Sequence, residues 1–414
     1  MRDFQQYSDY IFNMAPSYQN VGSKAYKEGL SNTVLFDERL GNPHTKYKTI
    51  HIAGTNGKGS CSHTIASILQ ESGYKVGLYT SPHLLSFTER IRVNGKPIEE
   101  DYVMDFIDEH RTFIESISPS FFEVSTALAF KYFADREVDI AVIEVGLGGR
   151  LDCTNIITPI LSIITNISLD HIQHLGNTLD KIAFEKAGIM KKGIPCVIGE
   201  TVDETLPVFE RHAKETCTPV IYCSSKARKE MESIFELKGL YQRKNINTIL
   251  TSINELRLLG LNISDASIDN GLKRVIENTG LRGRWEQIKK NPTIVCDTGH
   301  NIGGFAYISQ QLKEQKCKTL RIVFGMVNDK DISGVISLLP DNAEYYFCQA
   351  SVKRALPVED LAKLASDKGL KGRLFTSVSE AIDTAISDSS EDDFIFVGGS
   401  TFVVADLLKK GLID

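Results

Sequence analysis

One string constrains the fold of this chain more than any other feature. Residues 48 to 69 read KTIHIAGTNGKGSCSHTIASIL, a β-prone apolar run that enters a glycine-rich turn and continues as a helix of good helix formers. A phosphate-binding loop requires this order of strand, loop and helix. Glycines at 54, 57 and 59 would let backbone N–H groups approach phosphate oxygens, and the helix adds the positive end of its dipole. The string therefore predicts an α/β fold that binds nucleotide phosphates.

Two side chains in the same string carry phosphate chemistry. Lys58 would contact the β- and γ-phosphates, and the hydroxyl of Ser60 could reach Mg²⁺. The string departs from the common pattern G-x-x-x-x-G-K-[ST], because Gly59 stands between Lys58 and Ser60. A glycine-rich turn without a nucleotide is the alternative interpretation, and the strand and helix on either side favour phosphate binding over it.

The rest of the chain alternates short β-prone runs with helical patterns, which is typical of βαβ units and a mainly parallel sheet. We expect strands at Lys48–Ile52, Val76–Tyr79, Ile140–Val145, Ile160–Asn166, Pro195–Ile198, Thr293–Cys296, Leu320–Phe324, Glu344–Cys348 and Phe394–Val397. We expect helices at Ser60–Ser72, Glu99–Ser116, Glu123–Asp135, Asn245–Leu259, Asn262–Glu277 and Gly304–Glu314, with a closing helix from Phe402 and a first amphipathic helix that ends near Pro16.

The alternation restarts after a glycine-rich passage, Gly280–Arg284, and this predicts a domain boundary near Gly283. We expect an N-terminal P-loop domain over residues 1–283 and a smaller C-terminal α/β domain over residues 284–414. About 130 residues suffice for an independent domain.

Composition narrows the class of protein. The 414 residues carry 47 Lys and Arg against 53 Asp and Glu, and the net charge of −6 argues against nucleic acid as the main partner. No apolar run approaches the roughly 20 residues that span a bilayer, and the N-terminus lacks the apolar core of a signal peptide. The eight cysteines include no CxxC pair, so neither a zinc ribbon nor a disulfide framework is indicated. We expect a cytoplasmic enzyme.

Acidic and hydroxyl side chains follow several of the expected strands. Glu144 closes the run DIAVIEVG, and Ser81 in YTSPHL follows another strand. Carboxyl ends of parallel strands are where a Mg·ATP site finds oxygen ligands, and a buried acid without a partner or metal would be costly. A helix cap or salt bridge for Glu144, and a turn for Ser81, are the structural alternatives.

Two further positions stay open on residue-level reasoning. His171 follows the run SIITNISLDH, where a histidine is more often structural than a ligand, and Asp170 and His174 lie beside it. Lys186 lies near a helix end next to Glu185 in AFEKAGIM. Its neighbours alone favour an ion pair on the surface.

Several strings coincide, in order, with one family. They are AGTNGKGS, TSPHL with FTERIRVNG, FFEVSTALAF, EVGLGGRLDCTN, SLDH, EKAGI, GRWE and DTGHN. From about Tyr26 to the C-terminus the chain resembles the bacterial folylpolyglutamate synthase/dihydrofolate synthase family of the Mur ligase superfamily. The strings EVGLGGRLD and GTNGKGS are highly specific, and the extra Gly59 belongs to this loop rather than to that of kinases or GTPases.

The resemblance implies an ATP-dependent amide ligase with an N-terminal P-loop domain, a smaller Rossmann-like C-terminal domain and two Mg²⁺ ions. The ATP-binding positions would be Asn56, Gly57, Lys58, Gly59, Ser60, Asn245, Arg284 and Asp297. The metal positions would be Ser60, Ser81, Glu144 and His171. The catalytic positions would be Lys58, Lys186 and His300. CO₂ would carbamylate Lys186, which turns a cationic amine into a carboxylate-like group suited to a place beside metal and phosphate.

The resemblance also implies a site for the pterin or pteroate part of the acceptor. It would be lined by Gly29, Leu30, Phe121, Phe122, Glu123, Leu151, Asp152 and Cys153. Two positions depart from the family pattern: the usual Ala of RLDATN is Cys153, and the HQ-type pair before Asn245 reads Tyr241–Gln242. Neither change removes a needed charge, and no His/Asp arrangement supports Cys153 as a nucleophile.

The implied reaction adds L-glutamate to dihydropteroate and to reduced folates. The acceptor carboxylate attacks the γ-phosphate of ATP, and glutamate then displaces phosphate from the acyl phosphate. Catalysis would be mainly alignment and charge neutralisation by Lys58 and the metal ions, with domain closure completing the site. We expect a monomer whose partners are these small molecules, with no nucleic acid and no membrane.

Four alternatives remain. A monofunctional folylpolyglutamate synthase would lack the dihydropteroate activity. A sister Mur ligase would need a separate UDP-binding domain before the P-loop. Only 47 residues or so precede the strand that begins at Lys48, which is too few for such a domain. A P-loop kinase or switch would need the motifs G-K-[ST] and Walker B, and we find neither. A non-catalytic nucleotide-binding scaffold would give no reason for Glu144, His171 and Lys186 to follow the P-loop in family order.

Overall fold

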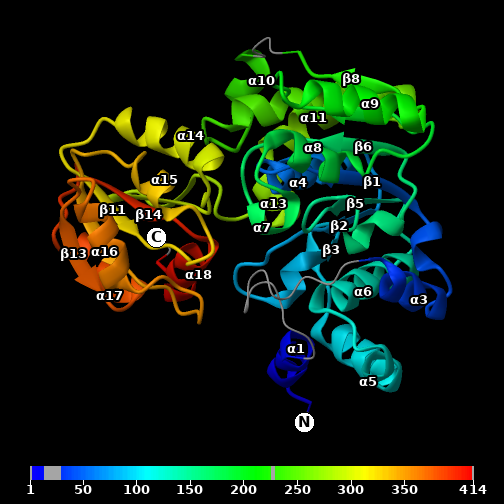
Figure 1. Cartoon of the computed structure of the whole chain (residues 1–414), viewed down its shortest axis with the longest axis horizontal. Coiled ribbons are helices and arrows are strands. Elements are labelled where there is room, and N and C mark those ends of the chain that lie inside the picture. The colour runs from blue at the N-terminus through cyan, green and yellow to red at the C-terminus, as the bar shows by residue number, and fades with distance from the viewer. Residues whose placement is uncertain (1, 14–28, 225–228, 413–414) are drawn as a thin grey trace. The chain divides into compact units, whose positions relative to one another are not determined.

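The computed structural model describes residues 2–13, 29–224 and 229–412, and the chain divides into two compact units (Figure 1). Unit 1 is Met1–Glu236 with Gln242–Leu281, and unit 2 is Leu237–Tyr241 with Arg282–Asp414. The chain leaves unit 1 for the last time after Leu281, close to the boundary expected near Gly283. The earlier passage of Leu237–Tyr241 into unit 2 was not predicted.

Unit 1 is built on a sheet with the strand order β4-β3-β2-β5-β1-β6-β7-β8. Its pairs are parallel, except that β3 lies antiparallel to β2 and to β4. The strands are β1 (Lys48–Ala53), β2 (Val76–Tyr79), β3 (Ile91–Val93), β4 (Lys96–Pro97), β5 (Ile140–Glu144), β6 (Leu161–Ile164), β7 (Cys196–Ile198) and β8 (Val220–Tyr222). The prediction of a mainly parallel sheet is confirmed, while β3, β4 and β8 were not predicted.

Helices and short 3₁₀ turns join these strands. The longer helices are α1 (Phe4–Asn13), α3 (Ser31–Arg39), α4 (Lys58–Glu71), α5 (Glu100–Ile117), α6 (Phe121–Asp135), α8 (Leu179–Ala187), α9 (Leu206–Thr216), α11 (Gln242–Leu258) and α12 (Asp265–Lys273). The shorter elements are η2 (Pro43–Thr45), η3 (Phe87–Arg90), η4 (Cys153–Ile156), α7 (Ile172–Leu175), α10 (Lys229–Ile234) and α13 (Val275–Thr279). Helix α1 is present as expected, but Pro16, where we expected it to end, lies outside the described residues.

The single helix expected over Asn262–Glu277 is wrong. Ser264 caps α12 by accepting a hydrogen bond from the backbone N–H of Ser267, and the helix stops at Arg274, whose φ of −130° is not helical. The Arg274 side chain bonds Glu71 and Glu277, and α13 begins at the next residue. Apolar spacing continued across this break, so the sequence pattern gave no sign of it.

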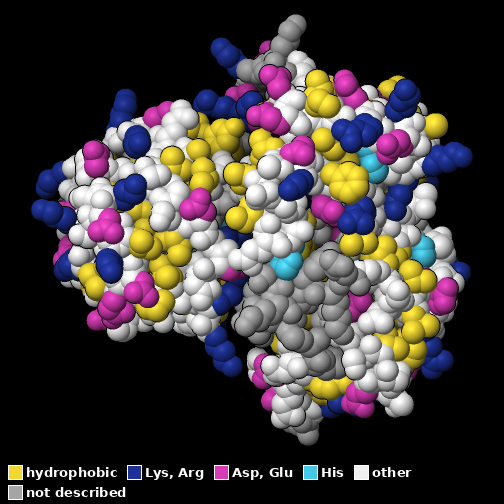
Figure 2. Space-filling view, viewed as in Figure 1, with side chains coloured by type: hydrophobic (Ala, Val, Ile, Leu, Met, Phe, Trp, Pro, Cys, Tyr) yellow, Lys and Arg dark blue, Asp and Glu magenta, His cyan; other side chains and the backbone are white. Residues whose placement is uncertain are grey.

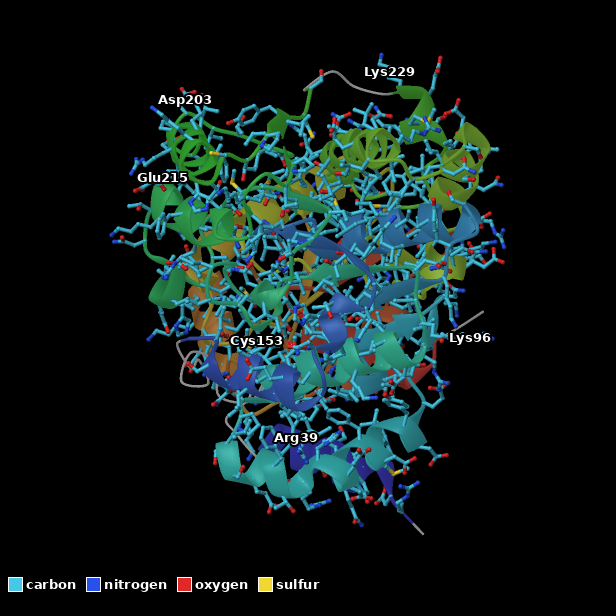
Figure 3. All side chains as sticks on the ribbon, turned by 90° about the vertical axis from the view of Figure 1, so that its right-hand side faces the viewer. Arg39, Lys96, Cys153, Asp203, Glu215 and Lys229 are labelled. Carbon is cyan, nitrogen blue, oxygen red and sulfur yellow. The ribbon has the colours of Figure 1, made fainter. Side chains whose placement is uncertain are left out.

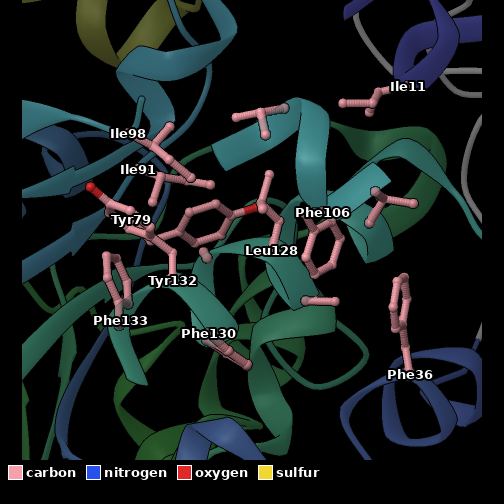
Figure 4. Packing of buried hydrophobic residues seen from close by; sticks show 14 of the residues in the cluster. Ile11, Phe36, Tyr79, Ile91, Ile98, Phe106, Leu128, Phe130, Tyr132 and Phe133 are labelled. Atoms are coloured by element: carbon pink, nitrogen blue, oxygen red, sulfur yellow. The ribbon is translucent and has the colours of Figure 1, made fainter. Parts of the chain in front are cut away.

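Two apolar clusters hold the unit 1 sheet between its helices. One contains Tyr79, Ile91, Phe106, Phe130 and Phe133 and joins strands β2, β3 and β5 to helices α5 and α6 (Figure 4). The other joins the ends of β1, β5 and β6 to α8 and α9. Helix α4, which follows the glycine-rich loop, packs against α11, α12 and α13 and against strands β1, β2 and β5. The residues from Ser60 to Leu69 are buried, so the loop at its N-terminus has a rigid base.

Unit 2 is a smaller α/β unit with the strand order β13-β12-β11-β14-β10-β9, in which only the edge pair β9–β10 is antiparallel. The strands are β9 (Glu286–Lys289), β10 (Thr293–Asp297), β11 (Leu320–Phe324), β12 (Glu344–Cys348), β13 (Gly372–Phe375) and β14 (Phe394–Gly398). The helices are α14 (Ile302–Lys313), α15 (Ile332–Ile336), α16 (Val358–Ser366), α17 (Val378–Ser387) and α18 (Thr401–Lys410). The expected Rossmann-like pattern is confirmed, and β9, β13 and α15–α17 were not predicted.

Positively and negatively charged side chains are mixed on the face of the molecule shown in Figure 2. Figure 2 has Lys and Arg side chains interspersed with Asp and Glu over that face of the described residues. Among the helices described, none combines the length and the hydropathy that a membrane crossing demands.

Candidate active site

The loop between β1 and α4 has a backbone that only glycine tolerates at two positions. Gly54 has φ +145°, and a Cβ there would lie 1.8 Å from Oγ1 of Thr165. Gly57 has φ +84°, and a Cβ there would lie 2.3 Å from Oδ1 of Asn245. Real side chains do not adopt such contacts, so the two glycines let the loop pack directly against the segment after β6 and against α11.

Hydrogen bonds to the end of β6 fix the same loop. The backbone N–H of Asn56 donates to Oδ1 of Asn166 at 2.9 Å, and its side-chain amide donates to Oγ of Ser168 at 3.1 Å. The Thr165 hydroxyl donates to the carbonyl oxygen of Asn56 at 2.6 Å. Sequence reasoning missed Thr165, Asn166 and Ser168, although the run SIITNISLDH places all three directly after a strand.

Two lysines converge on one carbonyl oxygen at the base of the loop. Nζ of Lys58 donates to the carbonyl of Gly54 at 3.0 Å and to that of Thr55 at 3.2 Å. Nζ of Lys186, which comes from the end of α8, donates to the same Gly54 carbonyl at 2.9 Å. The ammonium group of Lys58 beside a helix N-terminus makes a receptacle for an anion.

The residue-level interpretation of Lys186 as a surface ion pair is wrong. Its side chain is 4% exposed, and Glu185 bonds Arg150 instead. Burial, and then the charge of Lys58, lower the pKa of Lys186 to about 7. A substantial fraction of this amine is therefore neutral at physiological pH.

The hydroxyl of Ser60 is held by α11. Nε2 of Gln242 donates to Oγ of Ser60 at 3.0 Å, and the Asn245 amide donates to Oε1 of Gln242 at 2.8 Å. All three side chains are buried. Two of the three were assigned from sequence, whereas Gln242 was noted only as the second residue of the pair Tyr241–Gln242 that stands where the family has an HQ-type pair. Its contact makes it the residue that orients the Ser60 hydroxyl.

The remaining metal candidates come from the carboxyl ends of neighbouring strands. Glu144 is the last residue of β5, is 3% exposed, and accepts a hydrogen bond from the N–H of Ser81 at 3.4 Å. Ser81 follows β2, which pairs with β5. His171 lies after β6, with φ +51° and its backbone N–H on Oδ1 of Asp170 at 2.8 Å. Because β2, β5, β1 and β6 are adjacent in the sheet, these side chains and the loop occupy one edge.

The donor set at this edge is one that can hold a divalent cation. Among the described residues, no three His, Cys, Asp or Glu side chains gather as metal ligands. One carboxylate, two hydroxyls and an imidazole are few ligands by themselves. Mg²⁺, however, usually takes one or two protein carboxylates and completes its shell with phosphate oxygens and water.

The candidate acceptor residues lie together elsewhere in unit 1. The start of α6, the turn η4 and helix α3, which begins just after Gly29 and Leu30, pack against one another. Figure 3 labels Cys153 near the dark blue α3. Phe121 is buried and stacks on Phe12 with ring centroids 4.5 Å apart. Phe122 reaches Gly146, where a Cβ would lie 2.2 Å from the ring.

The two carboxylates of this acceptor region are bound by their own turns. Glu123 accepts from the N–H of Ser120 at 2.5 Å in a capping box. Asp152 accepts from the N–H of Leu147 at 2.8 Å and from the N–H of Thr154 at 3.0 Å. Burial raises the pKa of the Cys153 thiol well above its usual range, which agrees with its exclusion as a nucleophile.

The candidates of unit 2 gather at the end of β10. Asp297 is 2% exposed and accepts from the Tyr241 hydroxyl at 2.6 Å and from the N–H of Trp285 at 2.8 Å. The Arg284 guanidinium donates to the Thr298 hydroxyl. His300 contacts the Thr298 carbonyl through Nδ1 at 3.0 Å. Arg284, Asp297 and His300 are thus neighbours within unit 2.

The chain matches two family models. Residues 52–263 match the Mur ligase middle domain, and residues 283–401 match the Mur ligase, glutamate ligase domain. It is 33% identical to the dihydrofolate synthase/folylpolyglutamate synthase of Bacillus subtilis, over 93% of this chain and 95% of that protein.

Solved structures resemble the fold over nearly the whole chain. Escherichia coli FolC in complex with DHPP and ADP superposes with a TM-score of 0.86 and 30% identity, covering 99% of this chain and 97% of that one. A bifunctional folylpolyglutamate synthase/dihydrofolate synthase with Mn, AMPPNP and L-glutamate bound gives 0.84 and 27% identity, covering 99% and 98%.

Proposed function

Because the chain belongs to the dihydrofolate synthase/folylpolyglutamate synthase family of Mur ligases, ATP-dependent ligases that attach glutamate to folates, we propose that it uses both acceptors, dihydropteroate and reduced folates. The observation that supports the ATP-dependent step is the anion receptacle that Lys58 forms at the glycine-rich loop, beside the amine of Lys186. This anion receptacle lies at the sheet edge that also carries Glu144. A monofunctional folylpolyglutamate synthase has no observation in its favour over this enzyme.

The loop would hold the triphosphate of ATP. Backbone N–H groups from Asn56 to Ser60 and the ammonium group of Lys58 are the donors for the β- and γ-phosphates. Ser60, Ser81, Glu144 and His171 are the residues that would hold Mg²⁺. When bound, the metal neutralises charge on the phosphate oxygens. Asn245 packs directly on Gly57, which supports its role at the nucleotide.

Lys186 would serve as a carbamate. A neutral amine attacks CO₂, a C–N bond forms, and the nitrogen loses a proton to solvent, which leaves a carboxylate-like anion. The lowered pKa of Lys186, about 7, supplies the neutral amine that this step needs. The anion would lie beside Lys58 and become an oxygen ligand for a cation near the phosphates.

The chemistry then follows in two displacements. The acceptor carboxylate attacks the γ-phosphorus, the bond to the bridging oxygen breaks, and ADP leaves. The amine of L-glutamate attacks the acyl carbon, loses a proton, and expels phosphate as the amide forms. Lys58 neutralises the charge that moves to the leaving phosphate.

Unit 2 would contribute to nucleotide binding through Arg284 and Asp297, with His300 assisting. Support comes from their shared location at the carboxyl end of β10, where open α/β sheets bind ligands. Replacing Arg284 by Met should weaken ATP binding; unchanged affinity and unchanged turnover would overturn this role. We further propose that the protein is a monomer located in the cytoplasm.

The test is glutamate-dependent release of ADP by the purified protein in Mg·ATP, with 7,8-dihydropteroate and with a tetrahydrofolate as parallel acceptors. Turnover with both supports the bifunctional enzyme. Turnover with the folate alone reduces it to a folylpolyglutamate synthase. Release with neither, from protein that binds Mg·ATP, overturns the proposal.

A further inference from the structure

Arg90 is a buried cation that no role so far explains. It ends η3, just before β3, and its side chain is 3% exposed. Nε donates to Nδ1 of His83 at 2.8 Å. The guanidinium carbon lies 4.9 Å from the centroid of the Phe121 ring, as in a cation–π contact. The hydrogen bond and the ring together fix the orientation of the guanidinium.

The terminal nitrogens of Arg90 have no protein acceptor among the described residues. Within that part of the chain, its only hydrogen bond is the one to His83, and it forms no ion pair. The neighbouring Glu89 is committed elsewhere, because its carboxylate accepts from the N–H groups of Leu84, Leu85 and Ser86 at 2.9 Å each. Burying a guanidinium without an anion costs several kcal/mol.

Desolvation does not remove the charge. Burial lowers the pKa of Arg90 to about 10, so the group is still cationic at neutral pH. The free edge of a guanidinium offers two parallel N–H donors, a geometry that matches a carboxylate.

The surroundings of Arg90 indicate which anion it receives. Phe121 belongs to the acceptor region defined above, and the field of Glu144 acts on the same guanidinium. Arg90 thus lies near the acceptor region and also near Glu144, at the sheet edge that carries the glycine-rich loop. The reacting carboxylate of the acceptor must reach between these two places.

We propose that Arg90 binds the carboxylate of the acceptor, dihydropteroate or a folate, through its two terminal nitrogens. The proposal deepens the function proposed above and rests on it. Arg90 thereby orients the nucleophile of the first displacement and excludes acceptors that lack an acid at this end. L-Glutamate is the other source of a carboxylate, and the experiment separates the two.

The experiment compares the affinity of 7,8-dihydropteroate with that of its carboxamide, in the presence of Mg·ADP. In the wild type we expect the acid to bind about 10- to 100-fold more tightly, since truncating one partner of a buried charge pair costs 2 kcal/mol or more. In Arg90→Met that preference should fall to within about threefold.

Arg92→Met is the matched control. Arg92 lies two residues further along the chain, in β3, and is also buried. Its donors are used within the protein, Nε on the carbonyl of Glu89 at 3.2 Å and Nη1 on that of Gly95 at 3.0 Å. The control should lose thermal stability and keep the preference for the acid.

Each outcome decides the proposal. An undiminished preference for the acid in Arg90→Met overturns it, as does a KM for L-glutamate that rises tenfold while the preference stays.

If Arg90→Met fails to fold, Arg90→Lys replaces it, because an ammonium keeps the charge but lacks the fork. A drop in affinity for the acid but not the carboxamide then supports the proposal, and equal affinities for wild type and Arg90→Lys overturn it. A wild-type protein that prefers the acid through Arg90 but releases no ADP would refute only the proposed function.

Discussion

Two regions of unit 1 use their charged groups in opposite ways. In the phosphate region, residues 54–60 with Lys186 and Glu144, two lysines point at a single carbonyl oxygen. In the acceptor region, the carboxylates of Glu123 and Asp152 are bound by the N–H groups of their own turns. The first region gathers two amines at the loop proposed to bind phosphate, whereas the second uses charge to shape its backbone. A residue's chemistry alone therefore does not tell whether it acts on a substrate.

The largest expected effect tests the phosphate region. Lys58→Met should reduce kcat by about 10³-fold or more, because the charge that neutralises the leaving phosphate is lost. Lys191→Met is the control, since that amine donates to the Asn155 carbonyl at 2.9 Å and faces no phosphate loop. Steady-state release of ADP measures both. A kcat of Lys58→Met within tenfold of the wild-type value would contradict the proposed role of the phosphate region.

A pair of glutamate substitutions compares the regions directly. Glu144→Gln should lower activity by about 10²-fold and raise the Mg²⁺ concentration at half-maximal rate, because a carboxylate ligand is lost. Glu123→Gln should leave the Mg²⁺ dependence unchanged and cost about 1 kcal/mol of stability, as for other capping residues. Metal titrations and urea unfolding separate the two results. An altered Mg²⁺ dependence in Glu123→Gln would break the comparison.

The backbone of the loop has its own test. Gly54→Ala should destabilise unit 1 by about 2–4 kcal/mol, since its Cβ meets Oγ1 of Thr165 at 1.8 Å and φ is +145°. Gly73→Ala is the control: φ is also positive, +86°, but no atom lies within 4 Å of a Cβ. Thermal denaturation should therefore separate crowding from backbone strain. Equal losses at the two positions would show that strain alone matters.

A pH test addresses the strand that joins the regions. His51 in β1 is fully buried, and its Nε2 lies 2.8 Å from Oγ1 of Thr154, beside Asp152. Burial lowers the pKa of His51 to about 3, whereas the unfolded chain protonates near pH 6.5. The unfolded state therefore binds more protons between these values, and stability falls as pH drops below 6.5, by about 2 kcal/mol at pH 5.

The matched variant for this pH test is His51→Gln, which has no titrating group. Urea midpoints at pH 7 and pH 5 should show a smaller acid loss in the variant than in the wild type. If wild type and variant lose the same stability between pH 7 and pH 5, His51 does not cause the loss.

The smallest effect is expected at Cys153. Desolvation raises the pKa of its thiol, and Cys153→Ala should change kcat with either acceptor by less than about threefold. A loss of tenfold or more with both acceptors would assign this thiol a direct role in the acceptor region.

Much of the architecture was predictable from local pattern. The runs around Lys48–Ala53 and Ile140–Glu144 are short, β-prone and bounded by turn residues, which is the pattern that predicts buried strands. The phosphate loop was predictable because Gly54 and Gly57 have positive φ values, which a glycine-rich string indicates locally, although their close contacts with Thr165 and Asn245 come from other segments. The break at Arg274 was not predictable, because it depends on side-chain partners as distant as Glu71.

The site residues divide along the same line. Lys186 looked like a surface residue because sequence neighbours say nothing about burial, which here comes from a loop 132 positions away. Gln242 and Arg90 lay in strings that the family resemblance used, but no role was assigned to them, because each matters through contacts made by the tertiary fold. Residues whose role depends on the partner rather than on the motif are the ones that sequence reasoning missed.

The passage of the chain from unit 2 back into unit 1 has one further consequence. Tyr241 is bonded to Asp297, and the very next residue, Gln242, is bonded to Ser60. No spare length separates the two anchors. Insertions are tolerated in most connecting segments, but here each of the two consecutive residues is engaged by a side chain of its own unit. Both residues at the crossing therefore serve the unit to which they belong, and neither is spare linker.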